Sequence, residues 1–381
     1  MTIVVTVLIF LVLISLHEFG HFAAAKLSGV GVFEFSIGMG PEIFSWVKGD
    51  TQYSIRAFPI GGYCRLEGED EDTESKTAFA NQKLWKRMIV ICAGAVLNLI
   101  LGFIIFLGLV FAGKTIVTTK VQMIEERSYM AESGIKEGDR IIAVNGHKIH
   151  FYNDIAYYLE NINKDTKIDV TVKRDGEKLD FSFMPSLEKE KYVYDENGVS
   201  VTTDINGIQK QSYITFDDSI KDQYAEYAGK TREGERYIIG FTPVREKAGI
   251  KNSMNEAYAY TCFVVKLVYG ALGDLFTGDA GIEDFSGPVG VATAVDTAVH
   301  TKGYSVESVL NLVAMLTINL GVFNLLPIPA LDGGRLLFLL IELFTRRRVP
   351  PDKEGLVHAV GMILLLAFAA VILFFDIKKL F

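Results

Sequence analysis

Four stretches of the chain are long, apolar and nearly free of charge. Residues 1–25 carry only Glu18 among Asp, Glu, Lys and Arg, residues 88–113 and 308–331 carry none of these, and residues 355–375 carry a single histidine. A helix needs about 20 mainly apolar residues to cover roughly 30 Å of hydrocarbon. The pattern predicts a membrane protein, mainly α-helical, with four transmembrane helices. A cleaved signal peptide is the alternative for the first stretch, but no basic segment precedes its apolar run.

The segment between the second and third apolar stretches has a different character. Residues 114–307 hold 23 of the 38 basic and 31 of the 46 acidic residues, whereas the rest of the chain balances at 15 of each. This indicates a water-exposed acidic module. A net charge of -8 with 50% hydrophobic residues excludes a disordered or nucleic-acid-binding polypeptide. The three cysteines lie far apart and suggest neither a disulfide framework nor a Cys-based metal site.

Inside the acidic module, apolar and polar residues alternate as in half-buried strands. Asn145-Gly146 and Asp175-Gly176 are typical hairpin turns between such strands. Residues 187–236 are polar, have no helical period and indicate an insertion. In residues 252–276 apolar side chains recur at helical spacing, which fits an amphipathic helix on the membrane surface or a helix packed on a core.

Basic residues near the helix ends predict the orientation in the membrane. They are concentrated in the first and third connections, which are therefore expected on the cytoplasmic side. Lys378 and Lys379 after the last helix point the other way but are outnumbered. Both chain termini and the central module are then expected outside.

The first apolar stretch ends in the sequence HEFGH, with His17, Glu18 and His21 inside the predicted span. Ionisable groups there cost several kcal/mol unless they are paired or bound, so they indicate function. Residues i and i+4 lie on one helix face, where two imidazoles can bind one Zn²⁺. Glu18 would then take a proton from the water that zinc activates and pass it to the leaving amine. The pattern indicates peptide hydrolysis.

A catalytic zinc site usually has three protein ligands, so one more is expected elsewhere. The candidates near the later spans are Asp332, His358, Glu342, Asp376 and His300. Asp332 is favoured because it closes the run NLLPIPALDGG, whose prolines end a helix and whose glycines free the backbone. Such irregular backbone at membrane depth normally lies beside a cavity or in buried protein. The alternative is that Asp332 only caps the next helix.

The predicted crossings also place the two motifs at one depth. The first and third helices run in the same direction because one return crossing separates them. His17 lies roughly 21 Å into the first helix, and Asp332 follows the third. Both are expected in the cytoplasmic half of the membrane.

HEFGH at 17–21 and NLLPIPALDGG at 324–334 resemble the two motifs of the intramembrane site-2 protease family, in its bacterial branch with a PDZ domain between the second and third helices. The resemblance implies that His17, His21 and Asp332 bind zinc and that Glu18 is the catalytic general base. It also implies that substrate backbone contacts three further residues, namely Asn319, Asn324 and Pro327.

Further segments carry the same resemblance. Residues 35–41 and 59–67 resemble a membrane-associated β-hairpin that could hold an extended substrate by strand addition. Residues 93–98 resemble a Gly-containing segment with a polar Asn98, in which Ala95 replaces the usual proline, although Asn98 could equally join helices. Residues 133–146 and 170–176 resemble a circularly permuted PDZ domain, an α+β fold.

The expected organisation therefore has four parts. Residues 1–113 form the first two transmembrane helices with the HExxH motif and a cytoplasmic-side β-hairpin loop, and residues 114–186 form the PDZ domain. Residues 187–304 form the polar insertion and the surface helix, and residues 305–381 form the third and fourth transmembrane helices with the aspartate ligand.

By resemblance, the chain is an intramembrane zinc metalloendopeptidase that cleaves single-span membrane proteins, such as anti-sigma factors or remnant signal peptides, in regulated intramembrane proteolysis. The expected partners are these substrates, the lipid bilayer and peptide termini at the PDZ groove, with no nucleic acid. The expected location is the inner (plasma) membrane, multi-pass, with the PDZ domain extracytoplasmic and the active site towards the cytoplasm.

Two other functions stay open. One is a non-catalytic PDZ membrane scaffold with a structural or vestigial metal site, against which the intact Glu18 argues. The other is a metal-ion transporter, which would need ionisable residues on several helices, whereas the second and fourth helices offer little beyond Asn98 and His358.

Overall fold

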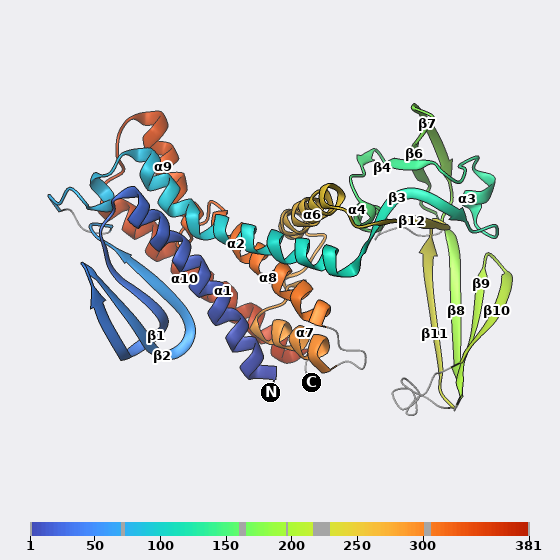
Figure 1. Ribbon diagram of the computed structural model, residues 1–381, viewed down its shortest axis with the longest axis horizontal. Helices are drawn as coiled ribbons and strands as arrows, with labels where there is room; N and C mark the ends of the chain where they lie inside the picture. Colours follow the sequence, from blue (N-terminus) through green and yellow to red (C-terminus); the bar gives the residue numbers. More distant parts are fainter. Residues whose placement is uncertain are drawn as a thin grey trace. The chain divides into compact units, whose positions relative to one another are not determined.

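The computed structural model describes residues 2–69, 73–159, 165–195, 197–215, 229–300 and 306–379. The chain divides into two compact units, whose elements are labelled in Figure 1. Unit 1 comprises Met1–Leu109 and Tyr260–Phe381, and unit 2 comprises Val110–Ala259. Unit 2 is thus inserted between two sequence segments that fold together.

Unit 1 consists of long helices and one β-hairpin (Figure 1). Its elements are α1 (Thr2–Ser28), β1 (Val32–Lys48), β2 (Thr51–Leu66), η1 (Phe79–Asn81), α2 (Leu84–Gly113), α6 (Ile250–Thr277), η3 (Ile282–Asp284), α7 (Pro288–His300), α8 (Val306–Leu325), α9 (Asp332–Thr345) and α10 (Pro351–Lys378), with α2 and α6 continuing into unit 2.

Five helices in the described part of the chain are long and apolar enough to cross a membrane, namely α1, α2, α6, α8 and α10. Four of them correspond to the four predicted stretches, and the integral membrane character is confirmed. The fifth, α6, is the predicted amphipathic helix, so the number four stays a prediction. The uncharged third stretch runs to residue 331, but the helix α8 ends at Leu325, because Pro327 and Pro329 cannot extend it, as the sequence indicated.

Small residues allow the helices that carry the predicted site to approach closely. A Cβ atom at Gly20 in α1 would lie 2.5 Å from the carbonyl oxygen of Ala93 in α2. A Cβ atom at Gly321 in α8 would lie 2.8 Å from the carbonyl oxygen of Ala95. Small residues at helix interfaces are typical of membrane proteins, where close van der Waals packing drives association. Therefore α2 packs between α1 and α8 with backbones nearly in contact.

The predicted hairpin is present, with β1 antiparallel to β2. Its register shifts repeatedly, and Gly38 and Gly40 have φ angles of 82° and 85° that favour glycine. Large apolar side chains such as Phe44, Trp46 and Phe58 are exposed on it. Such exposure fits contact with lipid or with another chain. Its association with the membrane stays a prediction.

Unit 2 contains two antiparallel sheets. Its elements are β3 (Thr115–Ile124), α3 (Tyr129–Glu132), β4 (Arg140–Val144), β5 (His147–Lys148), α4 (Tyr152–Tyr158), β6 (Ile168–Arg174), β7 (Glu177–Phe183), β8 (Ser186–Tyr194), β9 (Gly198–Ile205), β10 (Ile208–Thr215), β11 (Thr231–Ile238) and β12 (Phe241–Lys247). The first sheet has the order β12-β3-β4-β6-β7, with β5 beside β4, and the second has the order β10-β9-β8-β11.

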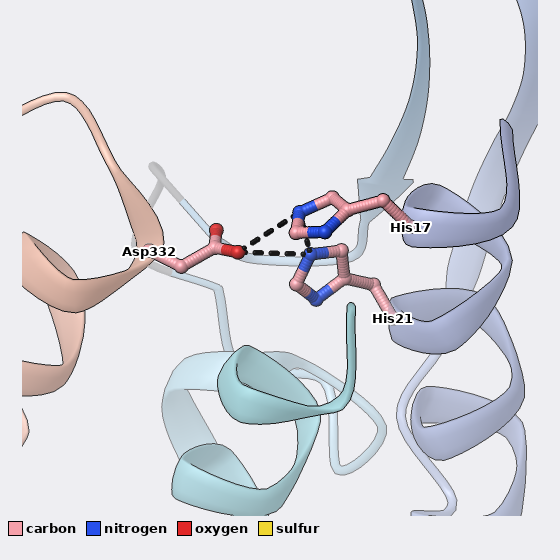
Figure 2. Close-up of side chains that lie close together, drawn as sticks. All are labelled: His17, His21 and Asp332. Carbon is pink, nitrogen blue, oxygen red and sulfur yellow. Dashed lines mark hydrogen bonds and ion pairs between the residues drawn. The ribbon is translucent and has the colours of Figure 1, made fainter. Parts of the chain in front are cut away.

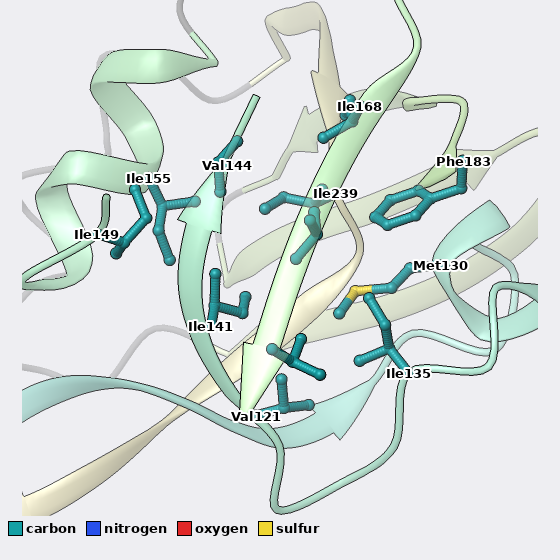
Figure 3. Packing of buried hydrophobic residues seen from close by; sticks show 12 residues of the cluster. Val121, Met130, Ile135, Ile141, Val144, Ile149, Ile155, Ile168, Phe183 and Ile239 are labelled. Carbon is teal, nitrogen blue, oxygen red and sulfur yellow. The ribbon is translucent and has the colours of Figure 1, made fainter. Parts of the chain in front are cut away.

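The first sheet surrounds the core that the alternating pattern predicts (Figure 3). Ile141, Val144, Ile168 and Val172 are fully buried there, against Met130 of α3. Both hairpin turns form as expected, with positive φ angles at Asn145-Gly146 and Asp175-Gly176.

One strand of the first sheet, β12, follows the insertion in sequence and pairs with β3. The compact unit therefore extends to Ala259, past the expected boundary at residue 186. The described parts of the predicted insertion (residues 187–195, 197–215 and 229–236) contribute the strands of the second sheet. That unit 2 is a PDZ domain stays a prediction.

An ion pair between Arg174 and the buried Asp139 fixes the turn before β4. Arg174 donates through Nε and Nη2 to the two carboxylate oxygens of Asp139, both at 2.7 Å, and Lys136 donates its backbone N–H at 2.8 Å. Burial alone would raise the pKa of Asp139, but these hydrogen bonds to the charged form lower it below its usual value. The Gly-Asp-Arg segment of the predicted PDZ pattern is therefore held by charge-assisted hydrogen bonds to β6.

Candidate metal centre

Three of the predicted site residues meet at one point in unit 1 (Figure 2). His17 Nε2 lies 3.0 Å from Asp332 Oδ2, His21 Nε2 lies 3.2 Å from the same oxygen, and the two Nε2 atoms are 3.1 Å apart. Among the described residues, these three form a group of side chains that could hold a metal ion. The structure thus brings together residues 315 and 311 positions apart, as the sequence predicted.

The spacing of these atoms fits zinc. Two ligand atoms of a tetrahedral zinc ion, each about 2.0–2.1 Å from the metal, lie about 3.3 Å apart. The three distances of 3.0–3.2 Å are close to this value, so the atoms outline one face of a tetrahedron. The fourth corner remains for water or substrate, as in catalytic zinc sites.

The lone pairs of the three atoms also fit a metal ion. His21 donates its Nδ1–H to the carbonyl oxygen of Val90 at 2.8 Å, so the neutral ring carries a lone pair at Nε2. That lone pair faces Asp332 Oδ2 at 3.2 Å. Two facing lone pairs repel each other unless a proton or a metal cation lies between them. The donor set therefore fits a metal ion.

The backbone before α9 turns sharply enough to aim Asp332 at α1. Ala330 has a φ angle of 76°, and a Cβ atom at Gly333 would lie 2.1 Å from the carbonyl oxygen of Leu326. Only glycine allows this close return of the chain. The N-cap of α9 is Leu331, and Asp332 is the first helical residue. The alternative role of Asp332 as a helix cap is therefore not what the geometry shows.

Glu18 is on α1 and lies next to the three candidate ligands. Its carboxylate interacts electrostatically with both imidazoles and with Asp332, and it accepts a hydrogen bond from the backbone N–H of Cys64. A Cβ atom at Gly62 would lie 3.6 Å from Glu18 Cγ. Strand β2 therefore runs beside the general-base candidate. The sequence pattern did not predict this contact, because a backbone N–H has no signature in the sequence.

The other candidate ligands have different roles in the structure. His358 Nδ1 accepts the backbone N–H of Ala330 at 2.8 Å, and Glu342 pairs with Arg87 at 2.5 Å. Asp376 accepts the backbone N–H of Gly290 at 2.9 Å. None of these three belongs to the metal group among the described residues. The side chain of His300 lies outside the described residues.

The predicted substrate-binding residues lie on α8 and directly after it. Asn319 is in the body of the helix, and its buried Oδ1 has no hydrogen-bond partner among the described residues. Asn324 is in the last turn and half-buried, and Pro327 is exposed in the connection to α9. Their contact with substrate stays a prediction.

Comparison with known proteins gives a consistent result. The pattern described as "Peptidase family M50" matches residues 5–368. A protein of Clostridium acetobutylicum is 32% identical over 98% of this chain and 97% of its own length, and one of Fusobacterium nucleatum is 31% identical over 100% of both. A protein of Staphylococcus aureus is 26% identical over 100% of this chain and 99% of its own.

All three relatives are named provisionally as zinc metalloproteases. The match to the family covers nearly the whole chain and includes both motifs whose side chains converge in the structure. The chain is thus an integral membrane protein of the metalloprotease class, and it belongs to peptidase family M50, the family of the site-2 proteases.

Proposed function

We propose that this protein is an intramembrane zinc endopeptidase of the site-2 type, which cleaves single-span membrane proteins within or near the bilayer. One observation carries the proposal: two imidazoles of α1 and the Asp332 carboxylate converge at 3.0–3.2 Å beside Glu18, on a helix able to cross a membrane. Ionisable groups at such a position are costly unless they bind something.

Each residue of the site has its own proposed role in the reaction. His17, His21 and Asp332 would hold the zinc ion. When bound, zinc acts as a Lewis acid that makes water a stronger nucleophile and polarises the scissile carbonyl. The Glu18 carboxylate accepts the proton that the attacking water loses, and later donates it to the nitrogen of the leaving amine. The backbone of Cys64 lies next to this carboxylate.

The β-hairpin offers a way to hold an extended substrate. A transmembrane helix must unwind before it can be cut, and its freed backbone groups then need partners. Strand β2 passes Glu18 at Gly62 and Cys64, so an extended segment added at this strand would reach the general base. Asn319, Asn324 and Pro327 are proposed to contact the substrate backbone from α8 and the connection after it, and the Oδ1 of Asn319, which has no hydrogen-bond partner among the described residues, supports this role.

Unit 2 is proposed to be a PDZ-type module that takes peptide ends. A groove of about 490 Å³ lies between α4 and the start of β12, lined among others by Ile155, Leu159, Gly240 and Phe241. In the described sheet, β12 is an end strand that pairs only with β3. An end strand beside a helix is the arrangement that binds peptides by strand addition.

The proposed setting is the inner (plasma) membrane, with unit 2 outside and the metal centre towards the cytoplasm. The proposed substrates are membrane-bound regulators such as anti-sigma factors, or remnant signal peptides, cleaved in regulated intramembrane proteolysis. The basic residues at the first and third connections support the orientation.

The decisive experiment compares the full-length protein with Glu18→Gln in detergent, using a single-span reporter and mass spectrometry of the products. Zinc-loaded wild type should cut the reporter, and Glu18→Gln should bind zinc but cut at least about 100-fold more slowly. Glu126→Gln, at an exposed position of unit 2, is the matched control and should cut like wild type.

Two results would overturn the proposal. One is a wild-type protein that lacks stoichiometric zinc or leaves every single-span reporter intact. The other is a Glu18→Gln protein that cuts as fast as the Glu126→Gln control. A scaffold without catalysis would instead retain peptide binding at unit 2 in both variants.

A further inference from the structure

One face of α2 packs against the two histidines of α1 that are candidate metal ligands. Val90, Gly94 and Asn98 are four apart and therefore lie on the same side of the helix. Val90 contacts His21, Gly94 faces both imidazoles, and Asn98 contacts His17. Along α2 the contacts reach first His21 and then His17, so the two helices are antiparallel here. This α2 face, defined by Val90, Gly94 and Asn98, is the second layer of the metal centre.

At one end of the α2 face, the backbone sets the tautomer of His21. The carbonyl oxygen of Val90 accepts the Nδ1–H of His21 at 2.8 Å. The proton is thereby kept at Nδ1, and Nε2 is free to bind a metal. The residue type at position 90 does not matter for this contact, because the acceptor belongs to the main chain.

At the other end, a fully buried amide lies next to His17. The Asn98 side chain is 0% exposed, and its amide nitrogen Nδ2 lies 3.4 Å from His17 Nδ1. Its Oδ1 atom is buried and has no hydrogen-bond partner among the described residues. A buried acceptor without a hydrogen-bond donor is unfavourable. The two ends of an amide exchange places by a half-turn, and Oδ1 would then accept the Nδ1–H of His17.

Between the two ends, Gly94 gives the imidazoles room. A Cβ atom at this position would lie 2.4 Å from His21 Nε2 and 2.9 Å from His17 Nε2. Both are the predicted ligand atoms. No side chain larger than hydrogen fits between α2 and the metal centre here.

We propose that Asn98 is a positioning residue of the metal centre, which accepts the Nδ1–H of His17 and so fixes the tautomer that binds zinc through Nε2. The Val90 carbonyl does the same for His21. A metal-bound histidine nearly always donates its second ring N–H to a fixed acceptor. The inference rests on the zinc centre of the proposed function, but it concerns α2 residues that touch neither metal nor substrate.

The test measures zinc binding rather than proteolysis. The full-length protein and its variants are stripped of metal in detergent, and the zinc dissociation constant is obtained by competition with a chromogenic chelator. Asn98→Leu, which lacks an acceptor, should weaken zinc binding about 10- to 100-fold. Asn98→Asp, which keeps an acceptor at the same place, should stay within about threefold of wild type. Asn311→Leu on the exposed side of α8 is the control and should bind like wild type.

A second measurement separates positioning from folding. In protein with ¹⁵N-labelled histidine, the ring nitrogen shifts report which nitrogen carries the proton. The wild type and Asn98→Asp should show His17 protonated at Nδ1, and Asn98→Leu should lose this preference while the signal of His21 is unchanged.

The outcomes distinguish this inference from the proposed function. Asn98→Leu with wild-type zinc affinity, or with an unchanged His17 tautomer, overturns the role of Asn98 and leaves the protease proposal intact. A wild-type protein that binds no zinc overturns both. Weakened binding in Asn98→Asp equal to that in Asn98→Leu also counts against the inference, because packing rather than the acceptor would then be responsible.

Discussion

At the scale of single residues, replacing Gly94 by alanine adds only one methyl group but is expected to impair the metal centre strongly. The added methyl group of Gly94→Ala would collide with both ligand nitrogens and push α2 away from α1. Zinc affinity should fall at least tenfold, and reporter cleavage about 100-fold, because a displacement of about 1 Å is enough to misalign a catalytic site. Chelator competition and the single-span reporter measure the two effects.

Gly108→Ala is the matched control for this prediction. It lies on the same helix, and a Cβ atom there would have no neighbour within 4 Å. Alanine favours a helix over glycine by about 1 kcal/mol, so this variant should be as active as wild type and slightly more stable. Equal zinc affinity in the two alanine variants would contradict the close contact at Gly94.

The sequence marks His17, His21 and Asp332 as candidate ligands because their side chains carry the chemistry, and the structure brings these three together. The spacing of His17 and His21 requires a shared helix face, and Asp332 was favoured because its flanking prolines and glycines demand irregular backbone. The Val90 carbonyl and the Cys64 N–H could not be predicted, because every residue has these groups. In the sequence, Asn98 is a polar residue of a segment that resembles the family and could equally join helices, but its partner depends on how α1 and α2 pack.

At the scale of elements, the segment between α8 and α9 depends on α10. His358 accepts the N–H of Ala330, whose left-handed conformation is part of the turn that aims Asp332. A Cβ atom at Gly361 would lie 2.4 Å from Pro329 Cβ, so α10 packs tightly on the same turn. The fourth predicted span therefore supports the metal ligand without binding the metal.

His358→Leu is expected to loosen this turn. The Ala330 N–H loses its acceptor, so Asp332 is held less firmly, and kcat should fall about tenfold while KM changes little. His358→Asn places its side-chain oxygen near the former Nδ1 position and should retain most of the activity. Steady-state cleavage of the reporter by both variants measures the difference. An inactive His358→Asn protein with normal folding, or a fully active His358→Leu protein, would contradict this role.

The elements that the sequence did not resolve share a physical cause. Strands β10 and β11 expose nearly every side chain, so no alternating apolar pattern marks them. Backbone pairing within the sheet, rather than burial, makes them strands. By contrast, β6 alternates because one of its faces covers the core, and the turns after β4 and β6 were readable from Asn-Gly and Asp-Gly.

At the scale of the whole molecule, the convergence of His17, His21 and Asp332 limits how many times the chain can cross the membrane between α1 and α8. Asp332 follows the end of α8 and meets the later half of α1, so the two helices run in the same direction. Helices that run in the same direction are separated by an odd number of return crossings. If both α2 and α6 crossed the membrane, α8 would run opposite to α1. The convergence of the ligands therefore favours four crossings with α6 at the surface.

Removal of zinc is expected to affect unit 1 and leave the core of unit 2 unchanged. A zinc ion held by His17, His21 and Asp332 would join α1 to the start of α9, and its loss would leave two imidazoles and a carboxylate without a counter-charge. A ligand present at 100 times its Kd stabilises the state that binds it by about 2.7 kcal/mol.

Hydrogen exchange with mass spectrometry on the full chain should show faster exchange around residues 13–25 and 326–336 after chelation. Strands β4 and β6 should keep their protection, because their core lies within unit 2. In Asp332→Asn the fast exchange should be present before chelation and change little afterwards. Uniform acceleration across both units, or none at the metal centre, would show that the ion does not hold α1 and α9 together.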